Sequence, residues 1–153
     1  MIIAKKIRLF PTKEQETKMI ESCNTARYIY NYTLVKQEQN HKDGNLFIKN
    51  TEIRKELTQL KKTEKFSWLN NVSNNVTKQA VKDACNAYTK YFKGLSEKPK
   101  FKKKGKSKES FYNDDYKLKI KDESLLLEKV GWIKIKPNQV DKNIHYTNPR
   151  ITY

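Results

Sequence analysis

The sequence predicts an α+β fold with a strand at the N-terminus, helices in the middle and short antiparallel strands at the end. Three observations support this prediction. Residues 2–10 are rich in β-branched side chains, partly alternate and stop at Pro11, as a strand does. Apolar side chains in residues 12–94 recur at helical spacings, whereas from residue 111 on the period is two. This order predicts that the first strand joins the later sheet.

The first helix is predicted to begin after Thr12, which forms a capping-box pattern with Gln15. Apolar side chains continue at spacings of three and four to Leu34. Asn24–Thr25 predicts a pause, since Thr25 could cap a second segment. The helix is expected to end before Asp43–Gly44.

Two further helices are predicted before residue 95. One runs from Thr51 to about Lys62. The other is capped by Ser73 or Asn74 and is closed by Gly94. Its apolar stripe consists of Val76, Ala80, Ala84, Ala87, Tyr88 and Tyr91.

The chain changes character at residue 95, where a basic loop is predicted to span 95–110. Residues 98–108 read KPKFKKKGKSK and include seven lysines. Like charges at this density cannot pack together, so the run is either a solvated loop or a loop bound to a polyanion. Beyond it, strands are predicted in 116–120, 125–127 and 132–136, with two more strand pieces around Asn148–Pro149.

The charge balance indicates a nucleic-acid partner. The formal net charge is +16, from 33 Lys and Arg against 17 Asp and Glu. Self-repulsion of this size is relieved by a polyanion. No stretch approaches the ~18 apolar residues of a membrane span, and the N-terminus lacks a signal-peptide pattern. We therefore expect a cytoplasmic protein that binds nucleic acid and no membrane.

Metal and cofactor chemistry is not predicted. Cys23 and Cys85 lie far apart in helical patterns and in no Cys-x-x-Cys pair, which predicts two buried free thiols. His41 and His145 are isolated, and the acidic residues form no recognisable metal-binding set. We expect no cofactor and no catalytic residue.

Five collinear segments together resemble the N-terminal portion of TnpB, the OrfB-type protein of bacterial insertion sequences, which is related to type V CRISPR effectors and to Fanzor proteins. No single segment is decisive, but their order and spacing cover nearly the whole chain. The segments are KKIRLFPTKEQE (5–16), ARYIYNYTL (26–34), FSWLNNVSNNVTKQAVKDACNAYTKYFKG (66–94), KPKFKKKGKSKESF (98–111) and VGWIKIK (130–136).

The resemblance implies that different parts of the chain belong to different domains. Residues 1–11 and 111–153 would form a small, oligonucleotide-binding-like barrel called WED, the latter part truncated. Residues 12–94 would form an inserted helical REC-like bundle of about three helices. Together these hold a guide RNA and read a short DNA motif beside the target. The family's RuvC-like nuclease domain follows this region and is expected to be absent here, so we expect no DNA cleavage.

The candidate binding residues fall into three groups. Lysines suit phosphate contacts, and an aromatic ring among them can stack on a base. Amides and lysine on the first turns of the third helix can read base edges, and the resemblance places that helix at the target-adjacent motif. The groups are Lys98, Lys100, Phe101, Lys102, Lys103, Lys104 and Lys106; Asn74, Asn75, Lys78 and Gln79; and Arg8 with Arg27, which lie in the best-matching early segments.

Other interpretations remain open from the sequence. The lysine run could be only a solvated loop, and Asn74 could serve only as a helix cap. We expect Tyr30 in the core and leave Tyr28 and Tyr32 open. A different function class is a stand-alone duplex-DNA-binding protein, such as a helix-turn-helix repressor or a transposase accessory. A truncated sheet edge also predicts self-association.

Overall fold

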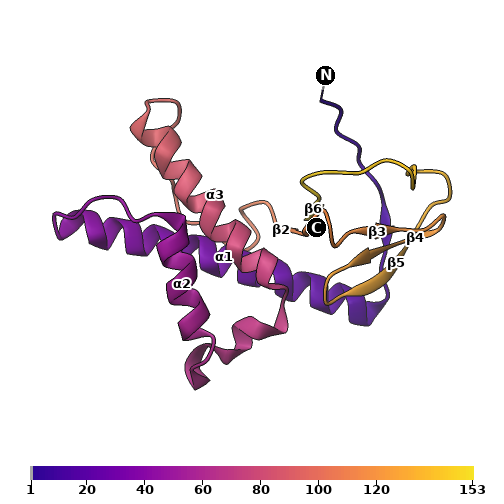
Figure 1. Cartoon of the computed structure of the whole chain (residues 1–153), viewed down its shortest axis with the longest axis horizontal. Helices are drawn as coiled ribbons and strands as arrows, with labels where there is room; N and C mark the ends of the chain where they lie inside the picture. The colour runs from indigo at the N-terminus through magenta and orange to yellow at the C-terminus, as the bar shows by residue number, and fades with distance from the viewer. Residues whose placement is uncertain (1) are drawn as a thin grey trace.

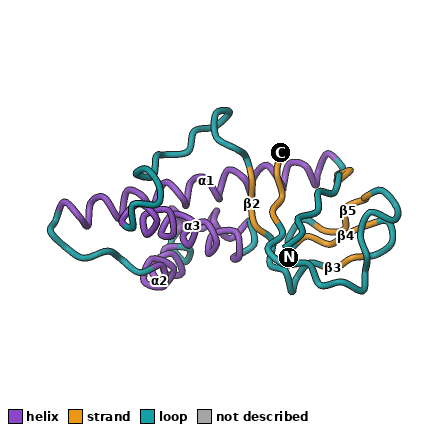
Figure 2. Tube along the Cα trace, turned by 90° about the horizontal axis from the view of Figure 1, so that it is seen from above, coloured by secondary structure: helices purple, strands orange, loops and turns teal. Residues whose placement is uncertain are grey.

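A computed structural model describes residues 2–153; residue 1, part of the predicted segment 1–11, lies outside the described residues. The long helix α1 (Lys13–Lys42) connects two regions (Figure 1). Its first turns lie beside the strands, and the rest packs against the other helices, as Figure 2 also shows. α1 is therefore the element that positions the helical region relative to the sheets.

Local sequence explains both ends of α1. The Thr12 Oγ1 accepts a hydrogen bond from the Gln15 N–H (3.2 Å), and the Gln15 side chain accepts one from the Thr12 N–H (2.9 Å). At the other end Gly44 has a φ of +77°, which glycine adopts without a Cβ penalty. The predicted pause at Asn24–Thr25 is wrong, because Thr25 is buried in the packed face of one continuous helix. Tertiary packing here overrides a local capping preference.

The helical region adds α2 (Asn50–Leu60), the 3₁₀ helix η1 (Glu64–Asn71) and α3 (Asn74–Phe92). Ser73 is the N-cap of α3 and accepts the Asn75 N–H, so Ser73 and not Asn74 has this role. α3 packs against the middle of α1, and α2 packs against α3. Their shared core is made by Ile29, Ile53, Leu57, Leu69, Ala80, Val81 and Cys85.

The strands form two antiparallel sheets. The first has the order β1-β5-β4-β3, with β1 at Leu9–Phe10, β3 at Lys119–Ile120, β4 at Ser124–Leu127 and β5 at Gly131–Ile135. The second pairs β2 (Ser110–Tyr112) with β6 (Arg150–Thr152). The predicted joining of the first strand to the later sheet is confirmed, because Leu9 pairs with Ile135.

Several details of the β-region differ from the prediction. Within residues 2–153 the two sheets form no closed barrel, and β1 covers only the end of the predicted strand 2–10. Tyr116 lies in a turn, since the Asp114 carbonyl accepts the N–H groups of Lys117 (3.1 Å) and Leu118 (3.0 Å). Asp therefore sets a turn where period-two spacing predicted a strand. Of the two strand pieces expected around Asn148–Pro149, only β6 forms.

The sheets and the helices share one apolar core. Ile133, Ile135 and Leu127 of the sheet pack in the same cluster as Cys23 of α1 and Val76 of α3. Both cysteines are buried free thiols, as predicted. Burial, chiefly, raises the pKa of Cys23 to about 11, with a smaller contribution from the nearby Glu109. The sheets are thus fixed on the helical region by apolar contacts as well as by the chain connections.

Candidate nucleic-acid interface

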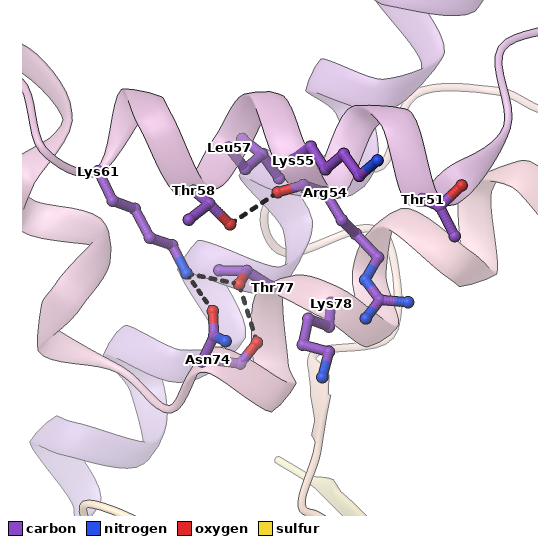
Figure 3. Close-up of a pocket in the computed structure, with 9 residues that line it drawn as sticks. All are labelled: Thr51, Arg54, Lys55, Leu57, Thr58, Lys61, Asn74, Thr77 and Lys78. Atoms are coloured by element: carbon purple, nitrogen blue, oxygen red, sulfur yellow. Dashed lines mark hydrogen bonds between the residues drawn. The ribbon is translucent and has the colours of Figure 1, made fainter.

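A pocket of about 310 Å³ lies between α2 and α3 (Figure 3). Its lining contains four basic side chains and no carboxylate. Arg54 extends from α2 toward α3, where Lys78 also lines the pocket (Figure 3). We call this the α2/α3 pocket, and its lining residues are Thr51, Arg54, Lys55, Leu57, Thr58, Lys61, Asn74, Thr77 and Lys78.

Hydrogen bonds to α3 hold the side chain of Lys61, the residue that follows α2. Its Nζ donates to the Asn74 Oδ1 (2.6 Å) and to the Thr77 Oγ1 (3.0 Å), both on α3. Burial lowers the pKa of Lys61, and the neighbouring charges of Lys129 and Lys78 lower it further. An anion bound in the pocket would offset this repulsion, so the arrangement suits a phosphate group.

The four predicted α3 residues lie on two faces of the helix. Asn74 and Lys78, four positions apart, both line the α2/α3 pocket. Asn75 donates to the Glu128 carboxylate (3.2 Å), and Gln79 donates to the Asp83 Oδ1 (2.8 Å). Residues i and i+4 share a face, whereas neighbours in sequence do not. The structure therefore brings Asn74 and Lys78 together and engages Asn75 and Gln79 elsewhere.

The lysine-rich loop, residues 98–108, is attached to α1. The Asn31 Oδ1 accepts the Lys102 N–H (2.8 Å), and the Asn31 Nδ2 donates to the Lys102 carbonyl (2.9 Å). The Lys102 Nζ lies 4.2 Å from the centroid of the Tyr30 ring, a cation–π contact. Burial lowers the pKa of Lys102, although the nearby Asp83 acts in the opposite direction. Figure 2 shows the loop that leads into β2 arching over α1.

The remaining predicted residues of this loop differ in their exposure and in whether they form ion pairs. Lys98 pairs with Glu38 (3.4 Å) on α1, and Lys100 pairs with Glu97 (3.6 Å). Phe101 is 47% exposed, which leaves much of its ring accessible. Four exposed lysines of the loop form no salt bridge with a carboxylate: Lys103, Lys104, Lys106 and Lys108. The loop thus presents exposed charges and an aromatic surface from a fixed attachment point.

The two predicted arginines have different surroundings. Arg27 makes a bidentate contact with the Glu109 carboxylate (2.7 and 2.8 Å), and its side chain is 17% exposed. A guanidinium held in this way fixes α1 to the start of β2. Arg8 is exposed, and its main-chain N–H donates to the Gln139 Oε1 (3.3 Å). Contact of the Arg8 guanidinium with nucleic acid remains a prediction.

Sequence reasoning missed the α2 side of the pocket. Arg54, Lys55 and Lys61 flank the buried positions Ile53 and Leu57, as charged residues do on any surface helix. Nothing in that pattern separates a binding surface from a solvated one. The packing of α3 alongside supplies the second wall.

The tyrosines left open by the sequence have separate roles. Tyr30 is half-buried and packs against Leu34, Ala84 and Tyr88, as expected for a core residue. Tyr32 donates its hydroxyl to Glu56. Tyr28 is 41% exposed and stacks edge-on against Trp68, with ring centroids 5.1 Å apart.

Neither a metal site nor a membrane span is found among residues 2–153. No three His, Cys, Asp or Glu side chains in this range gather as metal ligands would. None of the helices in the same range is long and apolar enough to cross a membrane.

Comparison with known proteins adds a family relationship. Residues 1–45 match the family HTH_OrfB_IS605, described as a helix-turn-helix domain. The chain is 29% identical over 129 residues to the "Putative RNA-guided DNA endonuclease InsQ" of Escherichia coli (strain K12), covering 84% of this chain and 32% of that protein. It is 28% identical over 105 residues to a "Putative RNA-guided DNA endonuclease" of Streptomyces pristinaespiralis, covering 69% and 26%.

The chain spans about a third or less of the length of these relatives. Both relatives carry names of the kind that the five-segment resemblance implied, and the family match falls on the segments nearest the N-terminus. The recognition made from the sequence is therefore confirmed: this chain is similar to the TnpB-type proteins of insertion sequences.

Proposed function

We propose that this chain is the nucleic-acid-binding module of a TnpB-like, transposon-encoded protein. It holds a guide RNA and reads a short DNA motif next to the target. The proposal assigns binding, and not cleavage, to these 153 residues. The first sheet would then be the counterpart of the WED domain, and the helical region that of REC.

The α2/α3 pocket is the observation that carries the proposal. It places Arg54, Lys61 and Lys78 around a space without a carboxylate lining. Such a site accepts a phosphate of a nucleic-acid backbone, and Lys78 can extend from there to a guanine acceptor in a major groove. Asn74 is positioned beside it and offers an amide for an adenine edge.

The lysine-rich loop supports the guide-RNA part of the proposal. Lys103, Lys104 and Lys106 are exposed on a loop that Asn31 anchors to α1. Flexible ammonium groups bind phosphates with little sequence preference, as the backbone of a structured RNA requires. The partly exposed Phe101 can stack on an unpaired base.

A stand-alone duplex-DNA-binding protein is the second candidate, because the matching family is described as a helix-turn-helix domain. The matched residues fold differently: after β1, residues 13–42 form one uninterrupted helix, α1. A recognition helix of a helix-turn-helix follows a tight turn after a first helix, and residues 13–42 contain no such turn. The shape of the helical region therefore favours the first candidate.

Binding measured at one salt concentration tests the two candidates. We expect the chain to bind a structured RNA more tightly than a duplex DNA of equal length. Replacing Lys78 with Gln should weaken motif-containing duplex DNA and leave the RNA affinity within about twofold, because base-edge contacts specify DNA sequence. Tighter binding to duplex DNA than to RNA would instead establish the repressor-like candidate.

A further inference from the structure

The first sheet has an outer face, opposite the face that packs on the core. Its inward residues, such as Leu125 and Ile133, are buried in the core. Side chains alternate along a strand, so the residues between them point to the opposite side. We call this the outer sheet face, and its residues are Phe10, Lys119, Ser124, Leu126, Trp132 and Lys134.

The strand register places aromatic and basic groups side by side on this face. Phe10 pairs with Lys134 across β1 and β5, and Trp132 pairs with Leu126 across β5 and β4. Phe10 and Trp132 are therefore diagonal neighbours, a spacing that aromatic side chains span. Lys119 is opposite Leu126 on the remaining strand. We call these two rings the platform; Lys134 is next to Phe10, and Lys119 is one strand beyond Leu126.

The exposure of the rings is the unusual feature of this surface. Phe10 is 46% exposed and Trp132 is 38% exposed. Lysines on a sheet edge are explained by protection against aggregation, but that role needs no Phe or Trp. The Lys121 Nζ lies 4.2 Å from the Trp132 ring centroid, where it occupies the position of a stacking partner. None of the six outer-face residues is acidic.

We propose that the outer sheet face binds unpaired nucleotides of RNA. One base stacks on Trp132 and a second on Phe10, while Lys119 and Lys134 contact the phosphates between them. The first base displaces the Lys121 ammonium from the Trp132 ring, and the ammonium is then free to pair with a phosphate. This surface is formed by the four strands of the first sheet and shares no residue with the α2/α3 pocket or the lysine-rich loop.

The choice of RNA as the occupant rests on the proposed function. In the proposed function the α2/α3 pocket binds DNA, so the guide RNA needs another surface. Single-stranded segments of an RNA can stack on exposed aromatic rings. Charge complementarity favours a polyanion over an apolar partner, since the platform is bordered by Lys119, Lys121 and Lys134 and the chain carries +16. The face thus has aromatic rings that can contact bases and lysines that can contact phosphates.

Tryptophan fluorescence gives a direct test, because the chain has two tryptophans. In a Trp68→Phe variant the remaining signal comes from Trp132. We expect a run of uridines, which does not pair with itself, to quench that signal saturably. Phe10→Leu, which keeps an apolar side chain but removes a ring, should weaken the binding about 5- to 100-fold, the range for loss of one stacked base. Lys134→Gln should weaken it and reduce its salt dependence.

Matched controls lie at the far end of α3. Phe92→Leu and Lys90→Gln change an exposed aromatic and an exposed lysine there, and both should leave the uridine affinity unchanged. Structured-RNA binding by the same Trp68→Phe protein without any change in Trp132 fluorescence would overturn this inference and leave the proposed function intact. Loss of all RNA binding would overturn both. A tighter complex with a run of deoxythymidines would show that DNA, and not RNA, is the ligand of this face.

Discussion

The side-chain amide of Asn31 forms hydrogen bonds with both the main-chain N–H and the main-chain carbonyl of Lys102. The amide oxygen of Asn31 is 2.8 Å from the Lys102 nitrogen, and its amide nitrogen is 2.9 Å from the Lys102 oxygen. A side-chain amide that pairs with a main-chain amide in this way imitates one step of a β-ladder. The contact joins positions 71 residues apart and makes the lysine-rich loop a part of the folded structure.

Replacing Asn31 with Ala should loosen the loop without changing any charge. We expect a loss of about 1–3 kcal/mol of stability from the two unmade hydrogen bonds. RNA affinity should fall as well, while the slope of log K against log salt should stay the same. Thermal unfolding and a salt titration measure the two effects. Asn86→Ala, an exposed change on α3, is the control and should do neither.

The lysines of the loop 98–108 should control the salt dependence of RNA binding. If about four lysines of residues 98–108 contact phosphates, log K should fall with log salt with a slope of about -3, at roughly -0.7 per contact. Replacing Lys102, Lys103 and Lys104 with Gln should flatten the slope by about two. An unchanged slope in this triple variant would mean that the loop is only solvated and that the helices carry the binding.

Lys61 should make DNA binding sensitive to pH. Burial lowers the pKa of this lysine below its ordinary 10.5, so it loses its proton at a lower pH than the other lysines do. A phosphate binds the protonated form, so DNA affinity should fall as pH rises through that lowered pKa. Lys61→Arg, whose charge is permanent, should flatten this decline at pH values below 10.5. Identical pH profiles would exclude Lys61 from the phosphate contact.

The lowered pKa of Lys61 also predicts a small effect of pH on folding stability, opposite in sign to its effect on DNA affinity. The unfolded chain holds the Lys61 proton more tightly than the folded chain does. Stability should therefore rise with pH in the window between the lowered pKa and 10.5. Unfolding by urea at a series of pH values, compared between the parent and Lys61→Arg, would isolate this contribution.

The pairing of β1 with β5 predicts the result of shortening the N-terminus. Deletion of residues 1–10 removes β1 and opens the edge of β5, so the variant should melt at a lower temperature and aggregate. Deletion of residues 2–6, which are exposed and belong to no strand, should be tolerated. A longer deletion as stable and as soluble as the parent would contradict the role given to β1.

Both thiols should be protected in the folded protein. Cys23 and Cys85 are buried, and burial raises the pKa of each. A thiol-specific reagent at mildly alkaline pH should therefore react slowly until denaturant is added, and then label both cysteines. Rapid labelling of native protein would show that α1 or α3 opens locally.

The sequence by itself determined the α+β class and the ends of the helices, and it predicted a nucleic-acid partner. The Thr12–Gln15 capping box, Ser73 and Gly94 act over a few residues, so neighbouring letters are enough to find them. The lysine run of residues 98–108 and the net charge of +16 are likewise visible without a structure. So is the likeness to TnpB-type proteins, which five segments carry in order.

Only the tertiary structure decided which of these residues act together. α1 is continuous through Thr25 because its packed face outweighs a local cap. The register of β1 against β5 put Phe10 beside Lys134, and the packing of α3 next to α2 turned ordinary surface charges such as Arg54 and Lys61 into a pocket. Contacts between residues far apart in sequence depend on the shape of the whole chain, and no local pattern encodes them.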